Sequence, residues 1–152
     1  MRLRRLLFLL PLSIMVIIFM FSAQTAGESL SVSDGLVYNI VSNFCRWLNI
    51  KNANINVICD SLRTIVRKSA HFSIYAMLGI SFVISLHFNF RFKLKRQLLL
   101  LSQVFSSAYA ITDELHQLFI SGRSGNFTDV LLDSFGAFFG VIIVYILFFR
   151  KK

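Results

Sequence analysis

The residues best suited to chemistry lie in one short segment, Asp113-Glu114-Leu115-His116-Gln117, which follows a long apolar run. On a helix, Asp113, His116 and Gln117 have i, i+3 and i+4 spacing and share one face, whereas Glu114 points about 100° away from Asp113. Ionisable side chains in an apolar segment are costly to bury and usually face a protein interior or a wet cavity. A carboxylate beside an imidazole there is suited to proton transfer, because burial and pairing shift both pKa values.

This acid/base interpretation has a structural alternative. An interhelical ion-pair network, with Asp113 paired to Arg67 or Arg123, would hold neighbouring helices together without any reaction. The number of polar groups at inward-facing positions favours a functional site over such a network. The candidate catalytic residues are therefore Asp113, Glu114, His116 and, from another segment, His71.

Basic residues near these acids are candidates for binding an anion. Arg67, Lys68 and Arg123 suit an anionic head group such as a lipid-linked phosphate, because arginine matches phosphate bidentately. The alternative is that they neutralise the nearby acids and snorkel to the membrane interface. The full candidate set for substrate binding is Arg67, Lys68, Tyr75, Gln117, Arg123, Asp129, Asp133 and Gln24.

A divalent metal is a further alternative, with His71, His116, Asp113 and Asp129 as its ligands. Two imidazole nitrogens and one or two carboxylate oxygens are ligand types that zinc accepts. Their spacing matches no known metal signature, and the HExxH pattern is absent. The sequence therefore identifies no cofactor and leaves a metal open.

The composition indicates a membrane protein that must position these residues with helices. Hydrophobic residues make up 56% of the 152 positions and charged residues 15%, whereas soluble domains carry about 25% charged residues. The length allows one domain, residues 1–152. The net charge of +9 is explained by cytoplasmic basic loops, and no basic stripe with stacking aromatic residues indicates nucleic acid.

Four apolar segments are predicted to span the membrane as helices. The first is retained rather than cleaved, because the residues that follow it make a poor signal-peptidase site. Between the first two spans, apolar residues at helical spacing over 34–50 predict an amphipathic helix on the membrane surface. The predicted spans are residues 6–22, 69–89, 97–120 and 129–149.

The distribution of charge predicts the orientation. Ten of the sixteen Lys and Arg residues lie in the N-terminus, the 91–96 loop and the C-terminus, whereas all seven acids lie towards the other ends of the spans. The positive-inside rule then places both termini in the cytoplasm. Cys45 and Cys59 would lie outside, and the sequence leaves open whether they form a disulfide.

The polar residues of all four spans are predicted to share one layer. At 1.5 Å per residue from the basic anchors, Gln24, His71, Asp113 and Asp129 lie about 26–32 Å along their helices, near the outer edge of the hydrocarbon. In the fourth span, Gly136-x-x-x-Gly140 continues the stripe formed by two aspartates. Such a glycine pair lets another helix approach closely.

The chain resembles the VanZ-like family of small bacterial membrane proteins. The segment 28–63 carries no family motif, and many relatives have Asn at the position of Asp133, which leaves the role of that carboxylate open. The resemblance implies a cell-envelope setting linked to resistance against the glycopeptide teicoplanin, and it implies no particular reaction. The motifs, in family order, are Phe21-Ser22-x-Gln24, Arg67-Lys68-x-x-His71-Phe72-x-x-Tyr75, Asp113-Glu114-x-His116-Gln117, Arg123-Ser124-Gly125 and Asp129-Val130-x-x-Asp133-x-x-Gly136.

We therefore expect an all-α protein with four transmembrane helices in the bacterial cytoplasmic membrane. Its polar site at the outer leaflet would bind, and as an enzyme would process, an anionic or lipid-linked envelope molecule. The alternative is a non-catalytic protein that alters antibiotic access or assists a partner, and a small transporter ranks third because the inner halves of the spans carry no ionisable relay. The expected partners are membrane lipids and no nucleic acid; substrate, catalytic activity and oligomeric state stay open.

Overall fold

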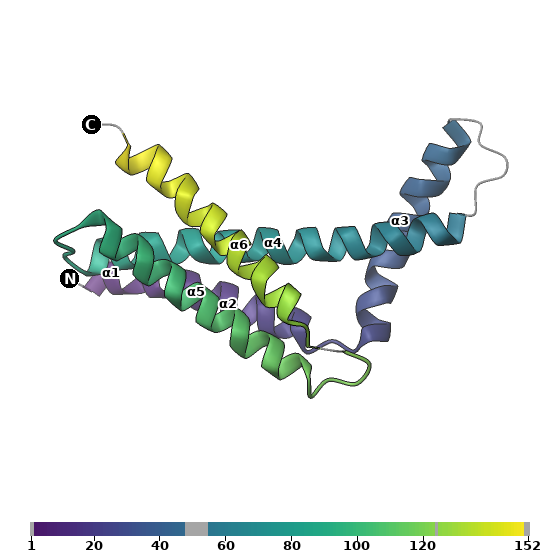
Figure 1. Cartoon of the computed structure of the whole chain (residues 1–152), viewed down its shortest axis with the longest axis horizontal. Helices are drawn as coiled ribbons and strands as arrows, with labels where there is room; N and C mark the ends of the chain where they lie inside the picture. Colours follow the sequence, from purple (N-terminus) through teal and green to yellow (C-terminus); the bar gives the residue numbers. More distant parts are fainter. Residues whose placement is uncertain (1, 48–54, 124, 151–152) are drawn as a thin grey trace.

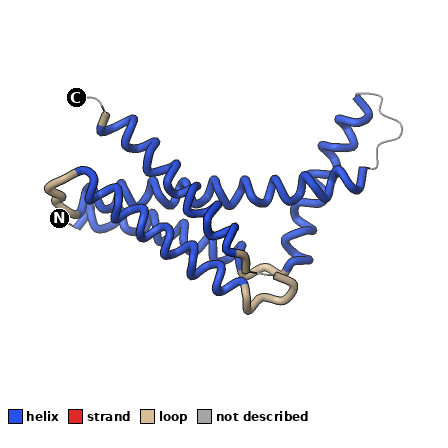
Figure 2. The backbone as a smooth tube through the Cα atoms, viewed as in Figure 1, coloured by secondary structure: helices blue, strands red, loops and turns tan. Residues whose placement is uncertain are grey.

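The computed structural model describes residues 2–47, 55–123 and 125–150, and every regular element within them is helical (Figures 1 and 2). The all-α prediction is confirmed for these residues. In chain order the elements are α1 (Arg2–Arg5), the short 3₁₀ helix η1 (Leu6–Phe8), α2 (Leu9–Ser22), α3 (Ala26–Trp47), α4 (Ile55–Asn89), α5 (Lys95–Gln117), α6 (Phe127–Val144) and the π-helical turn η2 (Tyr145–Phe149).

Each predicted span corresponds to a helix, although several ends differ. The segment 6–22 forms η1 and α2, and 69–89 is the C-terminal part of α4, a continuous helix of 35 residues. The amphipathic helix predicted at 34–50 is α3, which begins earlier, at Ala26. Its predicted end at 48–50 lies outside the described residues.

The third predicted span, α5, ends at Gln117 rather than at residue 120 because the chain turns sharply into α6. The Phe119 N–H donates to the His116 carbonyl at 3.0 Å and closes a tight turn. Gly122 then adopts a φ of 77°, a backbone conformation that glycine reaches without strain. The Asn126 side chain accepts from the Thr128 N–H at 3.2 Å and caps the start of α6.

Within the described residues, two helices are long and apolar enough to cross a membrane, Leu62–Asn89 and Phe127–Phe149. The segment Leu6–Ser22 is apolar but shorter. Residues 97–120 do not pass this test of length and composition, so the prediction of four spans stays a prediction. The position of α3 on the membrane surface likewise stays a prediction.

The helix α5 is polar inside and apolar outside. Its buried face carries Ser102, Ser106, Asp113 and Gln117. Its exposed face carries a stripe of large apolar side chains, Leu100, Val104, Ile111 and Leu115, which Leu118 continues just after the helix. A soluble amphipathic helix has the opposite pattern. The polar residues lower the average hydropathy of α5, and the apolar exposed face fits apolar surroundings.

The long helix α4 is central to the packing and contacts α2, α3, α5 and α6. One apolar cluster joins α4, α5 and α6 around Val83, Leu98 and Val141. A second joins α2, α4 and α5 around Ile18 and Leu78. A third, smaller cluster packs α3 against the first turns of α4 and includes Cys59, a buried free thiol; the side chain of Cys45 lies outside the described residues.

Glycines allow α4 and α6 to cross in direct backbone contact, as the GxxxG spacing predicts. A Cβ built on Gly136 would collide with the Phe72 carbonyl, and one on Gly140 with the Ala76 carbonyl. Gly79 of α4 is in equally close contact with α6. This crossing fixes the distance between the two helices just below their polar ends.

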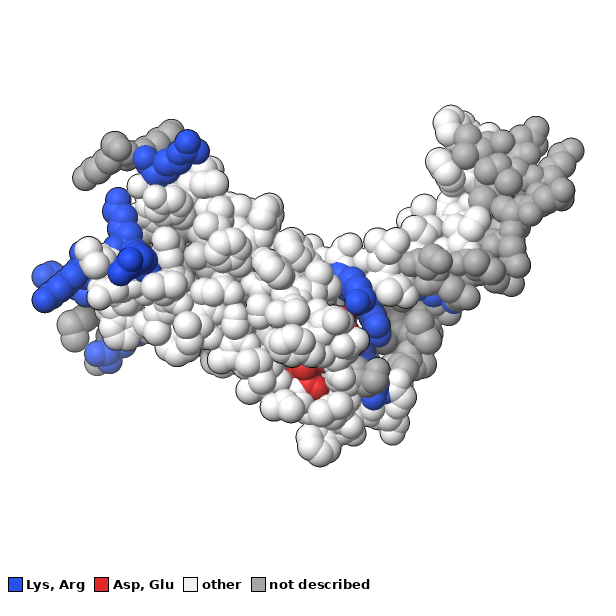
Figure 3. Space-filling view, viewed as in Figure 1, with Lys and Arg blue, Asp and Glu red and all other residues white. Residues whose placement is uncertain are grey.

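The helices bring like charges to the same end of the molecule. The N-terminus, the α4–α5 connection and the C-terminal end of η2 lie at one end (Figure 1), where Lys and Arg gather on the surface in Figure 3. We call this the basic end. The opposite end of the bundle, with the α2–α3 and α5–α6 connections, is called the pocket end. The acids visible in Figure 3 lie there.

Candidate functional site

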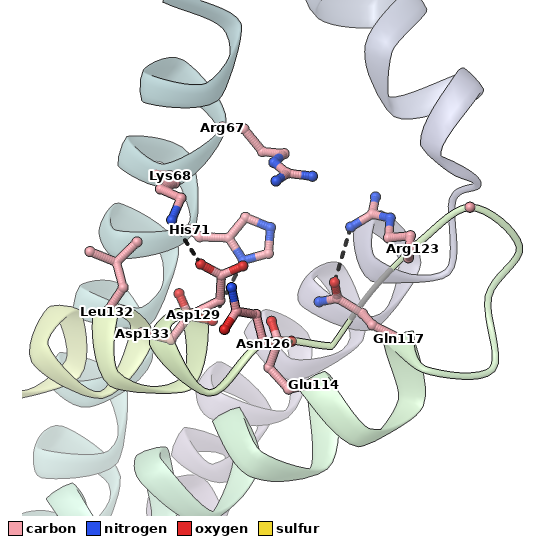
Figure 4. A pocket seen from close by; sticks show the side chains of 11 residues that line it. Arg67, Lys68, His71, Glu114, Gln117, Arg123, Asn126, Asp129, Leu132 and Asp133 are labelled. Atoms are coloured by element: carbon pink, nitrogen blue, oxygen red, sulfur yellow. Dashed lines mark hydrogen bonds and ion pairs between the residues drawn. The ribbon is translucent and has the colours of Figure 1, made fainter. Parts of the chain in front are cut away.

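A cavity of about 190 Å³ opens at the pocket end, between α4, the end of α5, the α5–α6 connection and the start of α6 (Figure 4). Most of its lining is polar. Eight of the predicted site residues and three others meet there: Arg67, Lys68, His71, Glu114, Gln117, Gly122, Arg123, Asn126, Asp129, Leu132 and Asp133.

Two guanidinium groups lie on one side of this cavity. Figure 4 shows Arg67, from α4, and Arg123, from the α5–α6 connection, with their guanidinium groups on the same side, away from the carboxylates. Burial lowers the pKa of Arg123, and the nearby Arg67 charge lowers it further. Arginine nevertheless stays protonated, so two like charges face the same space.

Arg123 is largely occupied by the fold. Its Nε donates to the Gln24 carbonyl at 3.0 Å, and its two terminal nitrogens donate to the Phe21 carbonyl at 3.2 Å and the Gln117 Oε1 at 3.3 Å. Phe21 lies in the last turn of α2, and Gln24 follows the end of that helix, where carbonyls have no partners within the helix. Arg123 thus joins the end of α2 to the end of α5. Among the described residues, Arg67 has no hydrogen bond or ion pair.

The face that α5 presents to the cavity differs from the predicted one. Glu114 and Gln117 line the cavity, whereas Asp113 is buried and does not belong to the lining. His116 lies instead against Phe19 of α2, with ring centroids 4.6 Å apart. The prediction that Glu114 points away from the polar face is therefore wrong. His116 is the residue that lies off that face.

Contacts further along α5 give the physical reason. On the side of His116, the Tyr109 hydroxyl donates to the Met15 carbonyl of α2 at 2.6 Å. On the other side, the Gln103 amide donates to the Ser134 carbonyl of α6 at 3.0 Å. These two bonds, to helices on opposite sides, set the rotation of α5 about its axis. Spacing in the sequence fixes the angles between the side chains of α5 but not the direction in which the whole helix faces.

Most carboxylates of the cavity already have partners. Glu114 Oε2 accepts from the Asn126 N–H at 2.9 Å, which helps to anchor the start of α6. Asp129 pairs with Lys68 at 3.0 Å. Asp113 accepts from the Gln117 amide at 3.3 Å, and no ion pair joins it to Arg67 or Arg123 in the described part of the chain. The alternative of an ion-pair network between Asp113 and Arg67 or Arg123 is thus not found among the described residues.

Besides Asp113 and His116, two further predicted site residues lie outside the cavity lining. Tyr75 is completely buried one turn below His71 on α4. Gln24 contributes its backbone carbonyl, which Arg123 binds. Three lining residues, Gly122, Asn126 and Leu132, are missing from the sequence-based set. Asn126 has a recognisable signal, because an Asn directly before an apolar helical segment is a typical N-cap.

One group of residues has the composition of a metal site. Ligand atoms of His71, Asp113 and Asp133 all lie within 4.8 Å of one another. His116 and Asp129, which the sequence-based metal set also includes, do not belong to this group. The structure therefore brings together two of the four predicted metal ligands and adds Asp133.

The comparison with protein families supplies the identity of the fold. A family model described as VanZ/LLP1 matches residues 7–149. The chain belongs to the VanZ/LLP1 family. The match covers nearly the whole chain, including every residue of the cavity lining, and confirms the resemblance to VanZ-like proteins. Together with its two apolar helices, membership identifies a VanZ-type membrane protein of the cell envelope. No curated protein and no solved structure matches the chain significantly.

Proposed function

We propose that this VanZ-type protein binds the anionic head group of a lipid-linked cell-envelope molecule at its pocket end. The observation that carries the proposal is the position of Arg67. Its guanidinium group lies on the same side of the cavity as that of Arg123 and has no partner among the described residues. An anion between the two groups would remove their repulsion and accept hydrogen bonds from both, as phosphate oxygens do.

The size of the cavity supports a head group rather than a whole antibiotic. A volume of about 190 Å³ corresponds to roughly six water molecules, at about 30 Å³ each. A phosphate or a similar small anion fits this space, whereas a glycopeptide does not. The lipid part of a ligand would lie along the apolar outer faces of the helices, where Leu115 and Leu118 are exposed.

We further propose that four helices span the membrane and that the pocket end lies at the outer leaflet. The support is the segregation of charge and the apolar exposed stripe of α5, which fits contact with lipid although the buried face of that helix is polar. With both termini in the cytoplasm, the cavity would open where lipid-linked envelope intermediates carry their head groups.

Binding has more support than a reaction. His116, the first candidate for a general base, contacts Phe19 outside the cavity. The Glu114 carboxylate accepts a hydrogen bond from the Asn126 N–H. A protein of this kind would change glycopeptide susceptibility by binding an envelope intermediate. This is the non-catalytic alternative in a specific form, and teicoplanin susceptibility is the phenotype that the family resemblance implies.

Arg67→Gln tests the proposal. It removes an exposed guanidinium group at the cavity, and we expect the fold to persist because Arg67 has no hydrogen bond or ion pair among the described residues. We expect the purified protein in lipid nanodiscs to bind a polyprenyl phosphate and not the corresponding polyprenol, measured by native mass spectrometry. The variant should bind the phosphate about tenfold or more weakly, since hydrogen bonds to charged groups contribute about 1.5–3 kcal/mol.

Arg46→Gln is the matched control, because Arg46 is exposed on α3 outside the cavity and the variant loses the same charge. Equal binding of phosphate and alcohol, or equal losses in both variants, would contradict the proposal. In cells, wild type and Arg46→Gln should change teicoplanin susceptibility alike. Arg67→Gln should lose the effect at normal protein abundance.

A further inference from the structure

Below the arginines, three helices contribute one ionisable side chain each to a single buried point. His71 comes from α4, Asp113 from α5 and Asp133 from α6, and their ligand atoms lie within 4.8 Å of one another. The Asp133 side chain is completely buried and Asp113 is 3% exposed, whereas the His71 side chain is 23% exposed and reaches the cavity. The group therefore lies at the cavity floor.

The carboxylates of this group have few hydrogen bonds. Neither oxygen of Asp133 has a hydrogen-bond partner, and neither does Oδ1 of Asp113. The His71 Nδ1 lies 3.5 Å from Asp133 Oδ2, which is long for a charge-assisted hydrogen bond. The Tyr75 hydroxyl, which neighbours Asp113, is also buried without a hydrogen-bond partner.

Two of the basic residues at this cavity are already bound to other groups. Lys68 pairs with Asp129 at 3.0 Å, and Arg123 is bound to two carbonyls and the Gln117 amide oxygen. Two ionised carboxylates beside one imidazole would carry an excess negative charge even with the imidazole protonated. Burying such a charge is strongly unfavourable unless a cation or several donors compensate for it.

The crossing of α4 and α6 holds two of the three side chains in place. Gly136 lies against the carbonyl of Phe72, the residue that follows His71. Asp133 lies one turn before Gly136 on α6. The backbone contact thus sets the approach of His71 to Asp133, and such rigid support by helices is what a metal site needs.

We propose that His71, Asp113 and Asp133 bind a divalent metal ion of the zinc class. One imidazole nitrogen and two carboxylates are a donor set that zinc accepts, and three protein ligands leave a coordination position for water or substrate. Zinc ligands lie about 2.0–2.2 Å from the ion, so the three side chains must close slightly around it. The site goes beyond anion binding at the mouth and does not depend on it.

Metal content tests the proposal directly. The full-length protein, purified in detergent, stripped with a chelator and dialysed against Zn²⁺, should retain close to one zinc per chain by elemental mass spectrometry. Asp133→Asn and His71→Ala should each weaken zinc binding by more than about tenfold, because even loss of an outer-shell partner has an effect of that size. His116→Ala and Asp129→Asn should bind zinc like wild type.

Thermal unfolding provides a second readout that does not require any variant to be active. Zn²⁺ should raise the unfolding temperature of wild type, because a ligand of the native state stabilises it. It should not raise that of Asp133→Asn, whose metal-free form should be at least as stable as wild type because one unpaired buried charge is gone.

Mg²⁺ serves as the control ion, because it prefers sites made of oxygen ligands. A wild-type protein that retains no zinc, or whose unfolding temperature does not respond to it, would overturn the proposal. Equal effects of Zn²⁺ and Mg²⁺, or zinc binding lost only with His116→Ala or Asp129→Asn, would overturn it as well.

Discussion

Arg67 and Arg123 carry the same group at the same cavity but have different environments. Arg123 donates three hydrogen bonds to the ends of α2 and α5, so much of its binding capacity is used by the protein itself. Arg67 is exposed at the cavity and has no partner among the described residues. The two arginines therefore differ in what a substitution should change: stability at one position, ligand binding at the other.

Arg123→Lys should destabilise the protein, although it keeps the charge. An ammonium group cannot reproduce the directed donors with which the guanidinium reaches Phe21, Gln24 and Gln117. We expect a loss of roughly 1–3 kcal/mol, measured as a lower unfolding temperature in detergent and a lower abundance in membranes. Arg67→Lys is the control and should unfold like wild type. Equal stability of the two variants would show that the three hydrogen bonds of Arg123 do not contribute to the stability of the fold.

At the scale of elements, the crossing of α4 and α6 determines where the site residues lie. These helices approach until a Cβ on Gly140 would collide with the Ala76 carbonyl. Lys68 and His71 on α4 then face Asp129 and Asp133 on α6 across the same contact. A change in the angle or distance between α4 and α6 would move the Lys68–Asp129 and His71–Asp133 pairs together. The glycines at the crossing therefore position the site although they do not line the cavity.

Gly140→Ala should destabilise the protein by roughly 1–3 kcal/mol, because the added methyl group overpacks a backbone contact. The sign of this stability change is informative, because replacing glycine by alanine within an ordinary helix stabilises the protein by up to about 1 kcal/mol. Gly35→Ala is the matched control, because a Cβ at Gly35 of α3 meets nothing within 4 Å. Thermal unfolding of both variants measures the difference. A Gly140→Ala protein as stable as Gly35→Ala would contradict the close crossing.

At the scale of the whole molecule, the ends of the helices separate charge. The basic end carries residues 2–5, 91–96 and 150, and the cavity with its acids lies at the other end. The apolar surface between them includes Val104 and Ile111 of α5 and Phe135 and Phe138 of α6. This arrangement fits a bilayer with the basic end in the cytoplasm.

Cysteine labelling tests this orientation. The native thiol of Cys59 is buried between α3 and α4, so it is a poor reporter. In a protein whose two cysteines are replaced by alanine, Ser121→Cys in the α5–α6 connection should react with an impermeant maleimide on intact cells. Lys93→Cys in the α4–α5 connection should react only after lysis. The reverse pattern would invert the proposed topology.

Much of the architecture could be predicted from the sequence, because the relevant signals are local or additive. Long apolar segments predict the helices, basic clusters predict which helix ends lie together, and the spacing of Gly136 and Gly140 predicts a close helix contact. Helical rise alone places His71, Asp113 and Asp133 at similar depths. The composition of the cavity end follows from these signals. The resemblance to VanZ-like proteins rests instead on residue motifs such as Asp113-Glu114-x-His116-Gln117.

The tertiary structure alone decided which side chains meet within that layer. Spacing on a helix fixes the angles between side chains but not the rotation of the helix about its axis, which its neighbours set. The bonds of Tyr109 to α2 and Gln103 to α6 therefore decide that Glu114 faces the cavity and His116 faces Phe19. The carbonyls bound by Arg123 are about a hundred residues away in the chain, so only the folded bundle brings them within reach.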